Sequence, residues 1–206
     1  MPEYGSVYDF DADGAASWHL PVLDDLPGGA DNHGSGHAVP VITEGDLRQR
    51  TILYALSRLG CSYALDRQPE EFVCDGLTEW AYRQATGERC TTSSDPHRDY
   101  VDASFQWDLI KSRGHDPWQA DVGTLRPGDL LFFGQQTVAQ GGGSIDYDGA
   151  PYHAGMYYRD GLMINARASG VQLTDIDWYA REFMPPYLGG GSPYAKEACR
   201  FEVPHL

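Results

Sequence analysis

The chain has little positive charge and no long hydrophobic run. Its 206 residues carry 15 Lys and Arg against 30 Asp and Glu, a formal net charge of −15. Such an acidic surface repels the phosphates of nucleic acids and anionic lipid headgroups, so neither nucleic acid nor a membrane surface is expected as a partner. Without a run of about 18 apolar residues, no membrane-spanning helix is expected either.

A secretory signal is also missing from the start of the chain. Residues 1–36 lack a basic stretch followed by an apolar one, and are rich in Gly, Asp and Pro. We therefore expect a protein that stays in the cytoplasm or is exported by a non-classical route. We interpret residues 1–42 as an irregular N-terminal arm and residues 43–206 as the folded domain.

Cysteine is scarce, and its spacing excludes two common uses. The four cysteines are Cys61, Cys74, Cys90 and Cys199. They form no C-x-x-C pair, so neither a zinc ribbon nor a thioredoxin motif is predicted, and they are too few for a disulfide scaffold. Glycines beside His33 and His37 argue against a helical metal site. We expect no metal and no cofactor.

What is present is a helical first half followed by strands. Apolar residues at helical spacing predict a helix over residues 44–59, with Thr43 as N-cap and Gly60 as the stop. A second helix is expected from Cys74 to about Thr86, and a short third one around residues 105–110.

The second half alternates short apolar runs with turns. A Gly-rich loop over residues 134–152 suits a lid, although a surface insertion is equally compatible. Residues 126–129 and 159–161 are predicted turns, the second inside a hairpin. The expected strands are residues 130–133, 153–158, 162–166, 171–174 and 200–203. Helices followed by antiparallel strands predict an α+β fold.

Cys74 stands out among the cysteines because a helix is expected to begin on it. The N–H groups and dipole of a helix N-terminus stabilise a thiolate. A cysteine nucleophile also needs a base, and the base needs an orienting group. His153 begins one strand of the hairpin and Asn165 lies on the other. These residues predict a Cys-His-Asn triad that cleaves an amide bond.

Five short motifs follow one another between residues 44 and 176. They are Leu59–Tyr63, Phe72–Leu77, Arg126–Phe133, His153–Tyr157 and Met163–Ala166. In this order they resemble the NlpC-type cell-wall cysteine peptidases. The resemblance implies a papain-like core, in which a helix-borne Cys packs on an antiparallel β-sheet.

The resemblance also implies roles for single residues. Cys74 matches the family nucleophile, His153 the general base, and Asn165 the third polar position, which is often His in the family. Tyr63 matches a tyrosine that helps to bind substrate. The oxyanion would be met by backbone N–H groups at the start of the helix, including that of Cys74.

The residues beside the nucleophile depart from the family pattern. Family members usually read Asp-Cys-Ser-Gly, where Asp and Ser help to grip a substrate amine, whereas this chain has Val73 and Asp75 around the cysteine. Val73 cannot hold an amine. Asp75 can raise the thiol pKa by repulsion, or bind a substrate ammonium, and the sequence leaves both open. Val73, Asp75 and Tyr63 are the candidate substrate-binding residues.

These observations leave three classes of function. The resemblance implies hydrolysis of a peptidoglycan stem peptide, typically between D-glutamate and a diamino acid, by a delivered toxin with an immunity protein as partner or by a phage component. This is the first hypothesis. The absent signal and the altered motif support an alternative to it, a cytoplasmic amidase or acyltransferase acting on a small metabolite or peptide in a biosynthetic pathway. A non-catalytic binding domain is the third class, and the complete triad argues against it.

Overall fold

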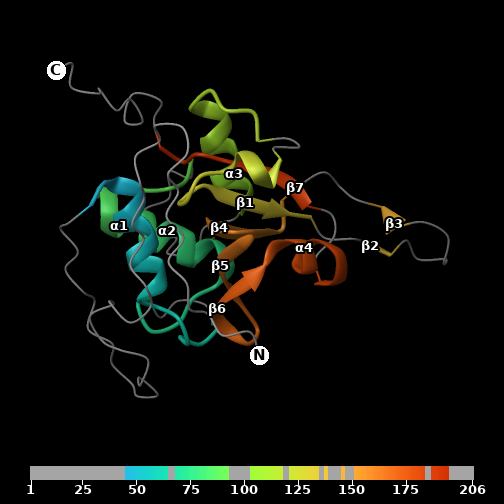
Figure 1. The fold of residues 1–206 in the computed structure, drawn as a ribbon, viewed down its shortest axis with the longest axis horizontal. Helices are drawn as coiled ribbons and strands as arrows, with labels where there is room; N and C mark the ends of the chain where they lie inside the picture. Colours follow the sequence, from blue (N-terminus) through green and yellow to red (C-terminus); the bar gives the residue numbers. More distant parts are fainter. Residues whose placement is uncertain are drawn as a thin grey trace.

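Three main helices pack beside an antiparallel sheet in the part of the chain that the structure describes (Figure 1). The computed structural model describes residues 45–64, 68–92, 103–117, 121–134, 137–138, 145–146, 151–183 and 187–194. The helices are α1 (Leu47–Leu56), α2 (Cys74–Thr86) and α3 (Ala103–Ser112). All three precede the sheet, which confirms the predicted α+β class.

The sheet has five strands in the order β6-β5-β4-β1-β7, and every neighbouring pair is antiparallel. Its strands are β1 (Leu130–Phe133), β4 (His153–Arg159), β5 (Leu162–Arg167), β6 (Gly170–Asp175) and β7 (Tyr187–Gly191). The predicted hairpin is confirmed, because Asp160 and Gly161 both take the positive φ that a tight two-residue turn requires.

The predicted helix boundaries hold for α2 but not for α1. Helix α2 begins at Cys74 and ends where Gly87 adopts φ 76°. Helix α1 begins at Leu47, capped by Asp46, whose side chain accepts from the backbone of Gln49 at 2.9 Å while the Gln49 side chain accepts from the Asp46 backbone at 3.0 Å. This reciprocal capping box satisfies two N–H groups at once. Thr43 lies outside the described residues.

Strand β7 was not expected from the sequence. Its glycines lack side chains to show alternation, but a Cβ on Gly190 would meet the Leu130 carbonyl oxygen at 2.4 Å. Glycine is therefore what lets β7 pair with β1 at the sheet edge. Residues 200–203, expected to close the sheet, lie outside the described residues, and the edge beside β1 belongs to β7.

The two faces of the sheet bury different cores. Helix α2 packs on the face that carries residues such as Ala154, Met156 and Ile164. The opposite face buries Phe133 and Tyr179 together with neighbouring apolar side chains. Tyr179 begins the turn of helix η3 (Tyr179–Phe183), which follows the short α4 (Ile176–Trp178) after β6. The site described below lies at the start of strand β4.

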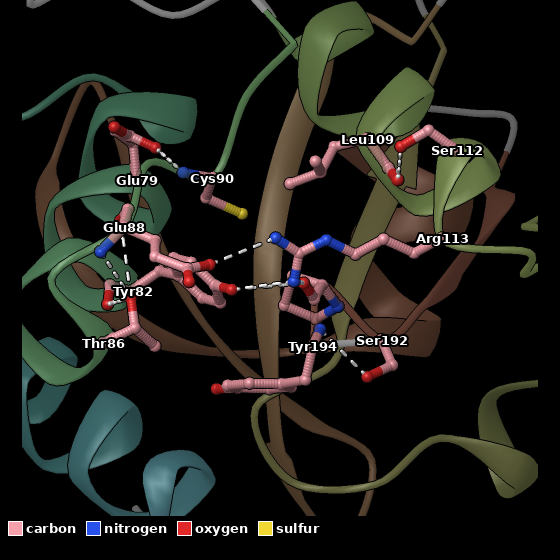
Figure 2. A network of polar contacts seen from close by, with 11 residues as sticks. Glu79, Tyr82, Thr86, Glu88, Cys90, Leu109, Ser112, Arg113, Ser192 and Tyr194 are labelled. Carbon is pink, nitrogen blue, oxygen red and sulfur yellow. Dashed lines mark hydrogen bonds and ion pairs between the residues drawn. The ribbon is translucent and has the colours of Figure 1, made fainter. Parts of the chain in front are cut away.

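Arg113, just after α3, ties that helix to α2 and to the segment after β7 (Figure 2). Its Nη1 donates to the Tyr82 hydroxyl at 2.9 Å and also to the Pro193 carbonyl. The guanidinium lies 5.8 Å from the centroid of the Tyr82 ring. These contacts fix the end of the described chain against the helices.

Two predictions about turns and loops have different outcomes. The turn predicted over residues 126–129 is present before β1, and Asp129 fixes it, because its Oδ2 accepts from the Arg126 backbone at 2.8 Å and its Oδ1 pairs with Arg48 at 2.6 Å. Within the loop expected as a lid, β2 (Thr137–Val138) pairs with β3 (Ile145–Asp146). Residues 141–143 lie outside the described residues, so the lid stays a prediction.

No helix among the described residues is long and apolar enough to cross a membrane.

Candidate active site

Cys74 is the first residue of α2, and its side chain is nearly buried, with 7% exposed. Val73 precedes it in an extended conformation and makes no side-chain capping bond. On the next helix, Gln106 donates from Nε2 to the Asp75 carbonyl oxygen at 2.9 Å. The contact from α3 holds the first turn of α2, and with it the cysteine, in place.

The sheet splits at the point that Cys74 approaches. Strand β4 pairs with β5 from Met156 onward, whereas His153 and Ala154 have register partners on β1. The backbone amide of Ala154 lies close enough to the Cys74 sulfur to act on it as a hydrogen-bond donor, which lowers the pKa of the thiol. The thiol of a helix on one face of the sheet thus reaches a strand whose first side chain, His153, points to the other face.

The structure brings the predicted site residues His153 and Asn165 together. The side-chain amide of Asn165 lies 3.3 Å from His153 Nε2 on one side and 3.0 Å from the Thr174 hydroxyl on the other. Asn165 is fully buried and Thr174 nearly so. Because Asn165 occupies Nε2, Nδ1 is the ring nitrogen left for the thiol.

Aromatic rings surround the imidazole of His153. The ring centroid of Tyr179 lies 5.0 Å away and that of Phe133 6.0 Å away. Burial, and after it the positive charge of Arg167, lower the pKa of His153 to about 3. The imidazole is therefore neutral at neutral pH, the form that a general base requires.

Cys74 is held as a protonated thiol in this structure. Burial is the largest cause that raises its pKa, followed by the negative charge of Asp75. The amides of Ala154 and Asp75 act in the opposite direction. The thiol donates to Asp75 Oδ1 at 3.3 Å rather than to His153. Of the two roles that the sequence left open for Asp75, the structure supports raising the thiol pKa.

The candidate substrate-binding residues differ in exposure. Tyr63 is 42% exposed and lies close enough to Tyr179 for its charge to affect the pKa of that phenol. Val73 and Asp75 are both buried. Tyr63 is thus the member of this group that presents its ring to solvent.

Tyr179 is a site residue that the sequence did not reveal. Its ring stacks beside His153, and burial and the charge of Cys74 both raise its pKa. It reaches the site because the chain after β6 folds back over the sheet. No local motif marks that turn.

The described residues contain no group of three or more His, Cys, Asp and Glu side chains placed to hold a metal ion. What the arrangement offers instead is a thiol at a helix start, a neutral imidazole on the adjacent strand and an amide behind that imidazole. Such a set of groups is suited to nucleophilic attack on an acyl carbon.

A family model described as "NlpC/P60 family" matches residues 60–185. This range contains Cys74, His153 and Asn165 and covers more than half of the chain. No curated protein matches the chain.

Several solved structures resemble the chain. NlpC2 from Trichomonas vaginalis has 24% identity and a TM-score of 0.50 over 76% of this chain and 49% of its own, so this chain spans about half its length. The NlpC/p60 domain of the peptidoglycan hydrolase SagA has 22% identity and a TM-score of 0.45 over 67% and 97%. RipD from Mycobacterium tuberculosis, described as a non-catalytic NlpC/p60 domain protein adapted to peptidoglycan binding, has 18% identity and a TM-score of 0.44 over 71% and 98%.

Proposed function

Since this chain belongs to the NlpC/P60 family, whose members are typically cell-wall peptidases, we propose that it is a cysteine peptidase that hydrolyses an amide bond of peptidoglycan stem peptides. The observation that supports the proposal most is the contact of the Cys74 sulfur with the backbone amide of Ala154, the residue that follows His153. Asn165 supports that histidine from behind.

The proposed reaction uses the two ring nitrogens of His153 for different tasks. Nδ1 takes the proton of Cys74, and the thiolate attacks the carbonyl carbon of the substrate amide. As the C–N bond breaks, the imidazolium returns that proton to the leaving amine, and a thioester remains on Cys74. His153 then deprotonates a water that attacks the thioester, which releases the carboxylic acid and restores the thiol. Nε2 stays with Asn165 throughout.

The thiol must leave Asp75 before it reacts. In the free protein it donates to the Asp75 carboxylate, and its pKa is raised. Catalytic hydrogen bonds often form fully only when substrate is bound. We propose that a substrate lying over Cys74 turns the thiol from Asp75 to His153.

The proposed scissile bond joins D-glutamate to a diamino acid, the bond that the resemblance to cell-wall peptidases implies. Tyr63 is exposed beside the site and is suited to packing against the stem peptide. As a cell-wall enzyme, the protein would act as a delivered toxin or a phage component. A toxin implies an immunity protein as partner.

One observation favours a second candidate function. Val73 is apolar and buried at the position where the family usually grips a substrate amine with a carboxylate. A site without that grip suits an amidase or acyltransferase whose substrate is a small metabolite or peptide. In acyl transfer, an amine or alcohol of a second substrate would replace the water.

Purified peptidoglycan tests the first candidate directly. The protein is incubated with it, and the released fragments are analysed by mass spectrometry. We expect fragments cut between D-glutamate and the diamino acid from the natural chain and none from Cys74→Ala. A natural chain that releases nothing, under conditions where iodoacetamide labels Cys74, would overturn the cell-wall substrate. Full activity of Cys74→Ala on any substrate would overturn the nucleophile.

A further inference from the structure

A row of polar side chains on β5 and β6 ends at His153. Asn165 and Arg167 lie two apart on β5, and Gln172 and Thr174 lie two apart on β6, so each pair points to one face of its strand. Asn165 is the register partner of Gln172. These four side chains, which we call the relay, form a chain of contacts in the spatial order Arg167, Gln172, Thr174, Asn165.

Arg167 sets the direction of the first hydrogen bond. A guanidinium has N–H donors and no acceptor, so the group that faces it must be an oxygen. With its amide oxygen toward Arg167, Gln172 accepts from Nη2 at 2.9 Å and also from Nε. Its amide nitrogen then donates to the Ser169 hydroxyl at 3.1 Å. The opposite orientation would direct N–H groups against N–H groups, so the network selects the first one.

The second bond follows from the first. With the Gln172 oxygen turned in this way, the Thr174 hydroxyl donates to it at 3.3 Å. A hydroxyl has a single hydrogen, so Thr174 must accept in its other contact, which joins it to the Asn165 amide at 3.0 Å. Rotating that amide by 180° makes its nitrogen the donor to Thr174 and keeps the contact.

The third bond then selects one form of the imidazole. The same rotation directs the Asn165 oxygen to His153 Nε2, across the contact of 3.3 Å. An oxygen there can only accept, so Nε2 must carry the proton and Nδ1 must carry the lone pair. Without the relay, Thr174 donates to Asn165, the Asn165 nitrogen faces Nε2, and the proton moves to Nδ1, where it prevents that nitrogen from accepting from the thiol.

We propose that Arg167, acting through Gln172, Thr174 and Asn165, fixes the tautomer of His153 with the proton on Nε2. Arg167, Gln172 and Thr174 are positioning residues, since they act on His153 through Asn165. The guanidinium is itself held in place, 5.4 Å from the centroid of the Trp178 ring. The consequence for catalysis rests on the proposed function, but the tautomer does not.

Nitrogen-15 NMR of histidine-labelled protein measures the tautomer without any substrate. A protonated ring nitrogen and one with a lone pair resonate far apart, and two-bond couplings to the ring protons distinguish Nδ1 from Nε2. The chain has seven histidines, and the signal absent from His153→Gln identifies His153. Near neutral pH the imidazole is neutral, so we expect a single tautomer protonated at Nε2.

Two substitutions at the half-buried Gln172 form a matched pair, because one keeps a hydrogen-bond acceptor at this position and the other offers only donors. Gln172→Glu keeps an acceptor between Arg167 and Thr174, so we expect the tautomer to stay. Gln172→Lys offers only donors, so we expect the relay to reverse and the proton to appear on Nδ1. Loss of the base should then slow Cys74 alkylation and peptidoglycan cleavage by about 10²- to 10⁴-fold.

Thr174 provides a second pair should the first fail to fold. Thr174→Ser keeps the hydroxyl and should keep the tautomer, while Thr174→Val has nearly the same shape and should give a mixture. A natural chain protonated on Nδ1, or a tautomer unchanged in both Gln172→Lys and Thr174→Val, would overturn the relay. If the tautomer behaves as expected but no peptidoglycan is cleaved, the relay stands and the proposed function fails.

Discussion

The Cys74 thiol is subject to opposing effects on its pKa, one of which comes from its neighbour Asp75. The first turn of a helix favours a thiolate, yet burial and the adjacent carboxylate together raise the pKa of the Cys74 thiol. In the free protein burial and the carboxylate outweigh the helix N-terminus, and the thiol donates to Asp75. The cysteine is therefore restrained until something displaces that contact.

Removing the charge of Asp75 should activate the thiol. Asp75→Asn removes the carboxylate charge, so the pKa of Cys74 falls, and each unit of that fall raises the thiolate fraction about tenfold. We expect iodoacetamide to label Cys74 on the order of tenfold faster at neutral pH, as followed by mass spectrometry of peptides. Cys90, which is fully buried in the same molecule, is the internal control. An unchanged or slower rate at Cys74 would contradict the restraint.

His153 makes the stability of the fold depend on pH. Burial lowers its folded-state pKa to about 3 from an ordinary 6.5, so below pH 6.5 the unfolded chain binds a proton that the folded chain excludes. Stability is present above pH 6.5 and is lost as pH falls toward 3. Urea unfolding should show a loss of about 2 kcal/mol between about pH 7.5 and pH 5 from this group.

The variant His153→Gln isolates that contribution, because glutamine does not titrate. Its unfolding free energy should fall by about 2 kcal/mol less than that of the natural chain over the same pH interval. Equal losses in the two proteins would show that His153 is not excluded from protonation in the folded state.

Among the elements, α3 is joined to its neighbours by Arg113 as well as by Gln106. Arg113 follows that helix and contacts Tyr82 on α2, as Figure 2 shows, and it also donates to the Pro193 carbonyl. Its ion pair with Glu88 spans 3.5 Å to a carboxylate that is 68% exposed, so solvent screens it and the bonds to Tyr82 and Pro193 carry the stability.

Arg113→Met should therefore destabilise the fold by about 2 kcal/mol, the usual cost of losing hydrogen bonds to a charged group. Lys111→Met on the same helix is the matched control. Lys111 is 52% exposed and its pair with Asp108 spans 3.9 Å, so its loss should change the unfolding free energy by no more than about 0.5 kcal/mol. Chemical denaturation of both variants measures the difference, and equal effects would contradict the role of Arg113.

For the whole molecule, the family match and both cores lie after residue 45. We therefore propose that residues 43–206 form the folded domain and that residues 1–42 are an accessory arm. Deleting residues 1–42 should change Tm by no more than about 4 °C, which corresponds to less than about 1 kcal/mol. The deletion should also leave the labelling rate of Cys74 unchanged. A large fall in Tm would make the arm part of the fold.

Local sequence signals predicted the elements that local forces form. Gly87 ends α2 and Gly161 forms a tight turn because both take a positive φ that other residues avoid. Local signals also placed Cys74 at the start of a helix and His153 at the start of a strand. Strand β7 escaped prediction because glycines have no side chains to alternate, and Asp46 displaced Thr43 because a capping box outweighs a single cap.

The sequence by itself determined the order of the elements and singled out Cys74, His153 and Asn165 as candidates, since spacing and turn residues act over short distances. Only the tertiary structure decided how those residues meet: β4 separates from β5 at one end, the thiol of α2 reaches Ala154, and Tyr179 returns to cover His153. These contacts join segments far apart in the chain, and the direction of each hydrogen bond depends on its neighbours. Such a network is visible only once the strands lie side by side.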